Sequence, residues 1–147
     1  MSKYAEKAKK IITDNIYLTI STTDGNTPWV APLFYCVDEA FNFYFISQLE
    51  SLHIKHILIN PRVAFAIFDS HQKEGTGNGV QGSGTVRQVP DEQLIEGLKW
   101  YKTTFIDLTP ENLKPPAPYR LFKIISETFF ILDPEAVVDK RVEVKLK

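Results

Sequence analysis

The sequence predicts a mainly β protein with peripheral helices, in which six or seven antiparallel strands close into a barrel. Three observations lead to this class. Segments rich in β-branched and aromatic residues recur along the chain, and short turns separate most of them. Only residues 43–68 have the strand–helix–strand order of a parallel crossover. A doubly wound parallel sheet needs several such crossovers, so we prefer the barrel.

The N-terminal part of the chain reads as a helix followed by a hairpin. Residues 3–13 place apolar side chains on one helical face and lysines on the other. A strand over residues 16–22 and a return strand over residues 29–37 flank the turn Asp24-Gly25-Asn26. Because proline cannot donate to a sheet, Pro32 indicates an edge strand or a bulge.

The C-terminal part contains a long strand, a helix and the closing strands. Gly82 and Gly84 interrupt a strand over residues 80–89, which indicates a bulge or a close approach to the backbone. We predict a helix from a cap at Asp91 to about Phe105. Strands follow over residues 119–126 and 128–132. The helix's apolar face would consist of Leu94, Ile95, Leu98 and Tyr101.

The end of the chain leaves two alternatives open. Val142, Val144 and Leu146 alternate with charged residues, so the tail either adds a short edge strand or frays. We expect one domain over residues 1–147, with an N-terminal helix over 3–13, a barrel core over 16–133 and a tail over 134–147.

Composition narrows the classes of function. The net charge of -1 gives no sign of nucleic-acid or membrane binding. No segment approaches the roughly 20 apolar residues of a membrane span, and the N-terminus lacks the apolar run of a signal peptide. The single cysteine, Cys36, cannot form an intrachain disulfide, which fits a reducing compartment. We therefore expect a cytoplasmic protein, and we interpret Cys36 as a core residue rather than a nucleophile.

The most informative stretch is residues 41–68. Its helix begins at Ser51, a good N-cap residue, and ends at Asn60-Pro61. Free N–H groups and the positive end of the helix dipole make such a start a site for anions. Ser51, His53 and Lys55 add a hydroxyl, an imidazole and an ammonium group.

Several residues of this helix have more than one interpretation. Ser51 caps the helix, contacts a phosphate, or does both. His53 and His56 lie three residues apart and could reach one metal ion, but no third ligand follows at a clear spacing. We therefore predict no metal site. No serine–histidine–acid arrangement follows from spacing, so the catalytic residues stay unassigned.

Three motifs resemble the pyridoxamine 5'-phosphate oxidase-like family, which has the FMN-binding split-barrel fold. The first is Pro28-Trp29-Val30-Ala31-Pro32-Leu33-Phe34-Tyr35 followed by Asp38. The second joins Phe43-Tyr44-Phe45-Ile46-Ser47, Ser51-Leu52-His53 and Asn60-Pro61-Arg62-Val63-Ala64. The third is Val80-Gln81-Gly82-Ser83-Gly84-Thr85-Val86. Their order and spacing, over residues 16–89, carry the resemblance.

The resemblance implies FMN at the interface of a homodimer, with its phosphate at the start of the helix after the third strand. By position, that start is Ser51, Leu52 and His53. The candidate cofactor-binding residues are Ser47, Ser51, His53, Lys55, Gln81 and Ser83. Gln81 and Ser83 either face the flavin or belong to the solvent-exposed face of a half-buried strand.

Two hypotheses of function follow. The first is an FMN-dependent oxidoreductase acting on a small molecule, in which the cofactor supplies the chemistry. The second is a non-catalytic protein that binds flavin or another cofactor on the same barrel. It arises because Leu52 occupies a position where many flavin-binding members of the family have arginine.

Overall fold

The computed structural model describes residues 2–103, 107–133 and 135–147. Its strands form one antiparallel sheet in the order β2-β1-β5-β6-β7-β4-β3, with β8 paired to β7. The strands are β1 (Tyr17–Thr23), β2 (Pro28–Phe34), β3 (Cys36–Val37), β4 (Phe43–Gln48), β5 (Arg62–Phe68), β6 (Gly79–Gln88), β7 (Tyr119–Leu132) and β8 (Arg141–Glu143). The helices are α1 (Lys3–Asp14), α2 (Leu52–Ile59) and α3 (Leu94–Trp100), and short 3-10 turns cover Asp91–Gln93 and Pro110–Leu113. The predicted mainly β split barrel is confirmed.

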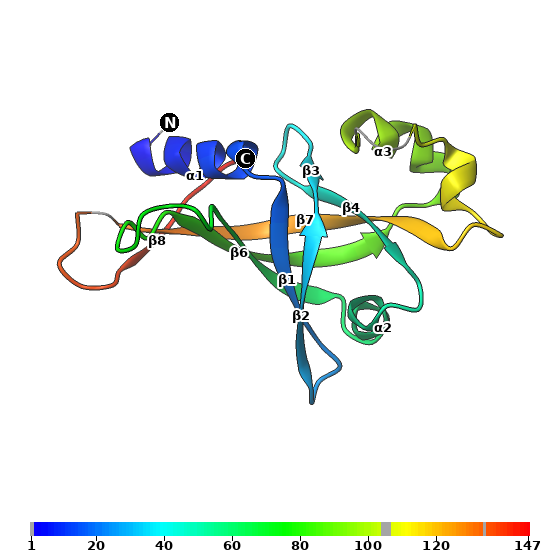
Figure 1. Ribbon diagram of the computed structural model, residues 1–147, viewed down its shortest axis with the longest axis horizontal. Coiled ribbons are helices and arrows are strands. Elements are labelled where there is room, and N and C mark those ends of the chain that lie inside the picture. Colours follow the sequence, from blue (N-terminus) through cyan, green and yellow to red (C-terminus); the bar gives the residue numbers. More distant parts are fainter. Residues whose placement is uncertain (1, 104–106, 134) are drawn as a thin grey trace.

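The sheet curls because its two edges are joined by the chain itself. β2 lies at one edge and β3 at the other, and only Tyr35 separates them in sequence. The backbone N–H of Tyr35 donates to the carbonyl of Ile16 at 3.0 Å, which fixes the crossing point. In Figure 1 the β1–β2 hairpin runs steeply across the long strands β6 and β7. The predicted edge position of Pro32 is confirmed, and the predicted strand over residues 29–37 is divided at Tyr35.

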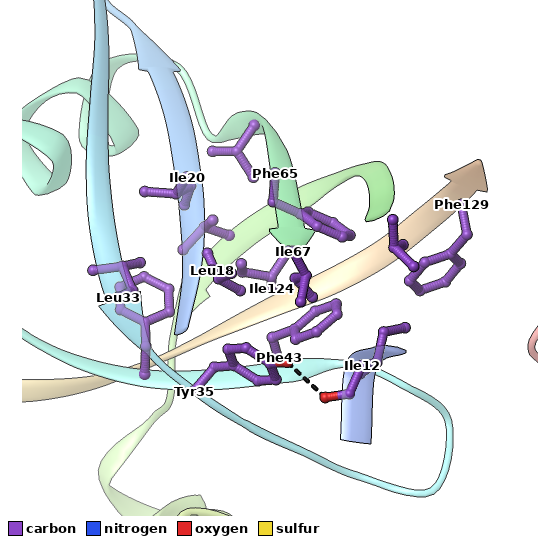
Figure 2. Packing of buried hydrophobic residues seen from close by; sticks show 14 of the residues in the cluster. Ile12, Leu18, Ile20, Leu33, Tyr35, Phe43, Phe65, Ile67, Ile124 and Phe129 are labelled. Atoms are coloured by element: carbon purple, nitrogen blue, oxygen red, sulfur yellow. Dashed lines mark hydrogen bonds between the residues drawn. The ribbon is translucent and has the colours of Figure 1, made fainter. Parts of the chain in front are cut away.

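The core fills the inside of this curl. Phe43 lies at its centre, with ring centroids 4.8 Å from Phe65 and 5.3 Å from Tyr35, and Phe65 lies 5.9 Å from Phe129. Figure 2 shows these rings together with the hydrogen bond from the Tyr35 hydroxyl to the carbonyl of Ile12 in α1, 2.6 Å long. Each such ring contributes about 1.5–3 kcal/mol by burial. The core therefore ties α1 and the sheet into one unit.

The opposite side of the sheet is an open face with two rows of uncharged side chains, and the Arg62–Glu127 ion pair borders them on the same face. Strand register places two rows of residues across five strands on this outer face. One row is Val30, Ser21, Ala64, Ser83 and Thr128, and the other is Pro32, Thr19, Ala66, Gln81 and Phe130. The buried residues of α1 and α2 belong to the core on the inner side, and α3 packs against β4 and the start of β7. Among the described residues, these rows therefore have no helix over them.

The predicted pair of closing strands is wrong, because residues 119–132 form the single strand β7. Ser83 pairs with Thr128 and Gly84 pairs with Ser126, which leaves Glu127 as the extra residue of a bulge. A bulge absorbs the irregularity without ending the strand. The predicted close approach at the glycines is confirmed, since a Cβ on Gly82 would lie 2.3 Å from Phe65 Cζ.

The helix predicted from Asp91 to about Phe105 is also too long. Asp91 opens a 3-10 turn without a side-chain capping bond, and Tyr101 is already extended at the end of α3. Phe105 lies outside the described residues. Ile95, expected on the buried face, is 71% exposed. Helix α3 instead packs through Gly97, where a Cβ would lie 2.7 Å from Leu121 Cδ2, so the helix is rotated away from Ile95.

The tail adds the edge strand that the alternating pattern allowed. β8 pairs with β7, and Val144 and Leu146 beyond it are buried in the core. Within residues 2–103, 107–133 and 135–147, no helix is long and apolar enough to cross a membrane.

Candidate functional site

A cleft of about 500 Å³ opens where the ends of β2 and β4 meet the start of α2. The β2 edge supplies Leu33 and Phe34, and the end of β4 supplies Ile46 and Ser47. Ser51 and His53 line it from α2, and Tyr119 closes it from β7. The cleft is therefore formed by elements that the curl of the sheet brings together.

Ser47, Ser51 and His53 form a hydrogen-bonded cluster in this cleft. The His53 Nε2 atom lies 2.8 Å from the Ser47 hydroxyl and 3.4 Å from the Ser51 hydroxyl. The predicted capping bond of Ser51 is wrong, because its hydroxyl donates to the carbonyl of Gln48 at 2.8 Å and makes no bond to a helix N–H. The Ser51 hydroxyl therefore points toward the turn that precedes α2 and toward the imidazole of His53.

The protonation state of His53 follows from its burial. The ring is half-buried, and burial lowers the pKa of His53 below its ordinary value of 6.5. The imidazole is therefore neutral at pH 7 in the ligand-free protein. An anion beside Nε2 would favour the protonated form and raise this pKa again.

The first turn of α2 presents free backbone donors. The first helical bond in α2 runs from the Lys55 N–H to the Ser51 carbonyl at 3.0 Å. In the described structure, the N–H groups of Leu52, His53 and Ile54 donate to no carbonyl or side chain. They carry the partial positive charge of a helix start.

Arg120 is a cation that sequence reasoning did not find. It is 8% exposed, and it pairs directly with Ser47 across β7 and β4, so the two side chains leave the sheet on the same face. Its Nη1 donates to the carbonyls of Ala117 and Tyr119. No carboxylate pairs with it in the described parts of the chain. Only the strand pairing brings Arg120 beside Ser47, so no local sequence signal could have identified it.

Lys55 is not brought into the cluster. Its ammonium lies 3.5 Å from the carboxylate of Glu50, and both side chains are exposed. Glu50 lines the cleft, so Lys55 balances an acid at its rim. In an exposed pair this effect is small.

Gln81 and Ser83 lie on the open face of the sheet and not in this cleft. Ser83 shares a 2.6 Å hydrogen bond with Thr128 on β7. Gln81 is exposed and sits between Ala66 and Phe130 in the sheet register. Within one chain, the six candidate residues therefore divide into a cleft group, a rim residue and a group on the open face.

The two helix histidines have separate partners. His56 is buried, and its Nδ1 lies 3.1 Å from the Thr22 hydroxyl on β1, whereas His53 faces Ser47. Among the described residues, no three His, Cys, Asp or Glu side chains are placed to hold a metal ion. Cys36 is half-buried and contacts the backbone of Lys102.

The fold is a split barrel with a cleft where the ends of β2 and β4 meet the start of α2. The chain belongs to the pyridoxamine 5'-phosphate oxidase family, whose profile matches residues 4–133. No curated protein sequence matches the chain.

Solved structures share the fold at low sequence identity. A heme binding protein from Mycobacterium smegmatis matches with a TM-score of 0.76 and 12% identity, over 99% of this chain and 59% of that one. This chain therefore spans well under two thirds of that protein. General Stress Protein 26 from Bacillus anthracis matches with a TM-score of 0.63 and 21% identity, over 95% and 98% of the two chains. A FAD-binding protein from Mesorhizobium loti matches with a TM-score of 0.64 and 19% identity, over 88% and 92%.

Proposed function

We propose that this protein binds FMN and acts as an FMN-dependent oxidoreductase on a small molecule. The observation that carries the proposal is the polar cluster of Ser47, Ser51 and His53, in which Ser47 pairs across the strands with the buried Arg120, a cation that no carboxylate of the described residues neutralises. Membership of the pyridoxamine 5'-phosphate oxidase family supports it.

The cleft has the donor chemistry that a phosphate group needs. The first turn of α2 offers free N–H groups, and the hydroxyls of Ser47 and Ser51 would exchange their present partners, His53 and the Gln48 carbonyl, for the phosphate. Arg120 supplies a permanent positive charge close to Ser47. Hydrogen bonds from charged groups to phosphate are among the strongest in proteins. The ligand-free His53 is neutral, and it would take up a proton as the phosphate binds.

The bound flavin would supply the redox chemistry. This chain's residues would hold the phosphate and keep it out of bulk water, with Leu33 and Phe34 as the apolar wall of the cleft. We assign no catalytic side chain.

The proposal includes a homodimer that covers the open face. The two rows of uncharged side chains on that face give a surface that a second copy can match by two-fold symmetry. Val30, 61% exposed, and Phe68, 52% exposed, are large apolar side chains on the same strands. In such a dimer, Gln81 and Ser83 would lie at the interface, where they could reach a cofactor held by the partner.

An absorbance spectrum of the purified protein, with mass spectrometry of whatever it releases, tests the proposal first. We expect flavin bands and FMN, or an apoprotein that takes up FMN on titration. Riboflavin, which lacks the phosphate, is the matched ligand and should bind at least tenfold more weakly. Protein that stays colourless with excess FMN and shows no thermal shift would overturn the proposal. Reduction by NADH or NADPH then tests the enzymatic part.

A second candidate is a non-catalytic carrier of flavin or another cofactor on the same barrel. Leu52 favours it, because an apolar, exposed side chain stands at the helix start, where an arginine would strengthen the anion site. In that case FMN binds, but neither pyridine nucleotide reduces it at a useful rate.

A further inference from the structure

A second pocket of about 440 Å³ lies beside the cleft, beneath the connection between β6 and β7. We call it the connection pocket. Leu108, Ala117 and Pro118 line it from the connection, and Ile46 and Tyr119 line it from the sheet. None of the described residues that line it carries a charge. Its lining is therefore suited to an uncharged molecule.

Buried contacts hold the walls of this pocket in place. Tyr101 and Leu113 belong to a small core that also contains Tyr44 and Leu121 of the sheet. The turn at Pro110–Leu113 has a capping box formed by Thr109 and Asn112. Arg120 binds the carbonyls of Ala117 and Tyr119. The pocket is thus formed without a ligand, which lowers the entropic cost of binding.

The pocket also offers hydrogen-bond donors. The hydroxyl of Tyr101 makes no hydrogen bond to the described residues, and it is accessible to a ligand because no fully buried side-chain N or O atom among them lacks a partner. Burial raises the pKa of Tyr101 to about 12, so the hydroxyl keeps its proton at neutral pH. The Asn112 side-chain oxygen accepts from Thr109, and its amide N–H₂ has no partner within the described chain. Both groups can donate to a ligand oxygen.

The connection pocket adjoins the cleft. Ile46 and Tyr119 line both. The Tyr101 ring also meets Phe34, a lining residue of the cleft, edge to face with centroids 5.8 Å apart. A molecule in the connection pocket would therefore lie next to whatever the cleft holds.

We propose that the connection pocket binds a neutral, ring-sized organic molecule with an acceptor oxygen, and that this molecule is the substrate. Its description as a substrate rests on the proposed function, but the binding preference does not. Phosphorylated and carboxylated molecules are excluded, because an unpaired charge in an uncharged, half-enclosed pocket is costly.

Calorimetric titration of the flavin-free protein with methyl 2-naphthoate and with 2-naphthoate tests this preference. The two probes share one ring system and differ in charge. We expect the ester to bind at least about tenfold more tightly than the anion. Equal binding of both probes, or no binding of the ester, would overturn the proposal.

Two variants locate the binding. Ala117→Trp should fill the pocket and abolish ester binding, whereas Ile95→Trp, on the exposed side of α3, should leave it unchanged. Tyr101→Phe removes one donor and should weaken ester binding about fivefold, without changing naphthalene binding. Ester binding that survives Ala117→Trp would place the ligand elsewhere.

The same titration with FMN present separates this inference from the proposed function. Ester binding that persists at saturating FMN supports two neighbouring compartments. Competition between the ester and FMN would assign the connection pocket to the flavin and overturn the inference. Ester binding to a protein that never binds FMN would overturn the proposed function alone.

Discussion

Ser47 and Arg120 face each other across β4 and β7, and both are buried, with Ser47 lining the cleft. The hydroxyl of Ser47 is bound to His53, while within the described residues the guanidinium of Arg120 binds only backbone carbonyls. A buried cation without a carboxylate is costly unless a ligand or the backbone compensates for it. This pair therefore places a positive charge next to a hydroxyl group of the cleft, and both groups favour the binding of an anion.

Arg120→Gln should weaken FMN binding at least tenfold, because a charge-assisted bond to phosphate contributes about 1.5–3 kcal/mol. Riboflavin binding should change little. Arg87→Gln on the exposed end of β6 is the matched control. Calorimetric titration with both ligands is the measurement. A parallel loss for FMN and riboflavin would show that Arg120 acts only by holding the loop at Ala117.

The half-buried His53 should make stability depend on pH. Its pKa is lowered in the folded protein, so the unfolded chain binds the proton more readily. The free energy of unfolding is then fully present above pH 6.5 and falls as the pH drops through the window below it. Urea unfolding across this pH window should show a smaller loss of unfolding free energy in His53→Gln than in the native protein. The exposed His71 gives the control, and equal slopes for His53→Gln and His71→Gln would contradict the assignment.

The same histidine should make FMN binding take up a proton. Phosphate favours the imidazolium form, so calorimetry near neutral pH in buffers of different ionisation enthalpy should report proton uptake that is lost in His53→Gln. Uptake that is unchanged in the variant would show that His53 is not the group that takes up the proton.

Leu52→Arg should tighten FMN binding. Leu52 is exposed at the start of α2, where a guanidinium would lie beside the free N–H groups of the first turn. Leu58→Arg, near the other end of the same helix, adds the same charge at a distance and is the control. If both variants tighten binding equally, general attraction is responsible and the helix start is not the phosphate site.

The order of the elements could be predicted from the sequence, because strand composition and turn residues are local. The strand–helix–strand unit over residues 43–68 and the cluster of Ser51 and His53 follow from such local signals. Two features could not be predicted. The continuity of β7 depends on a bulge at Glu127, and the place of Arg120 depends on its pairing with Ser47. Both are set by a strand distant in sequence.

Gly82→Ala should destabilise the fold by about 1–3 kcal/mol, the usual cost of overpacking. The added Cβ would lie 2.6 Å from the Thr128 carbonyl and closer still to the Phe65 ring. Gly79→Ala, whose nearest atom would be 3.4 Å away, is the matched control on the same strand. Urea unfolding of both variants is the measurement, and similar midpoints would show that Phe65 moves aside without cost.

The last prediction concerns the open face and the homodimer proposed for it. Ala64 lies in the middle of the first row of the open face. It is on the exposed side of β5, between Ser21 and Ser83. An obligate interface of this kind buries on the order of 2,000 Å² and tolerates no unpaired charge at its centre. Ala64→Glu should therefore convert a dimer into a 16.8 kDa monomer, while the fold survives because the side chain points into solvent.

Sedimentation equilibrium at micromolar concentration measures the change, with circular dichroism to confirm folding. Ile95→Glu, which places the same charge on the exposed side of α3, should stay dimeric. Because FMN would be shared between subunits, Ala64→Glu should also lose FMN, and dilution of the native protein should release it. A native monomer that holds FMN tightly would contradict both the dimer and the shared site, and would leave Gln81 and Ser83 as ordinary surface residues.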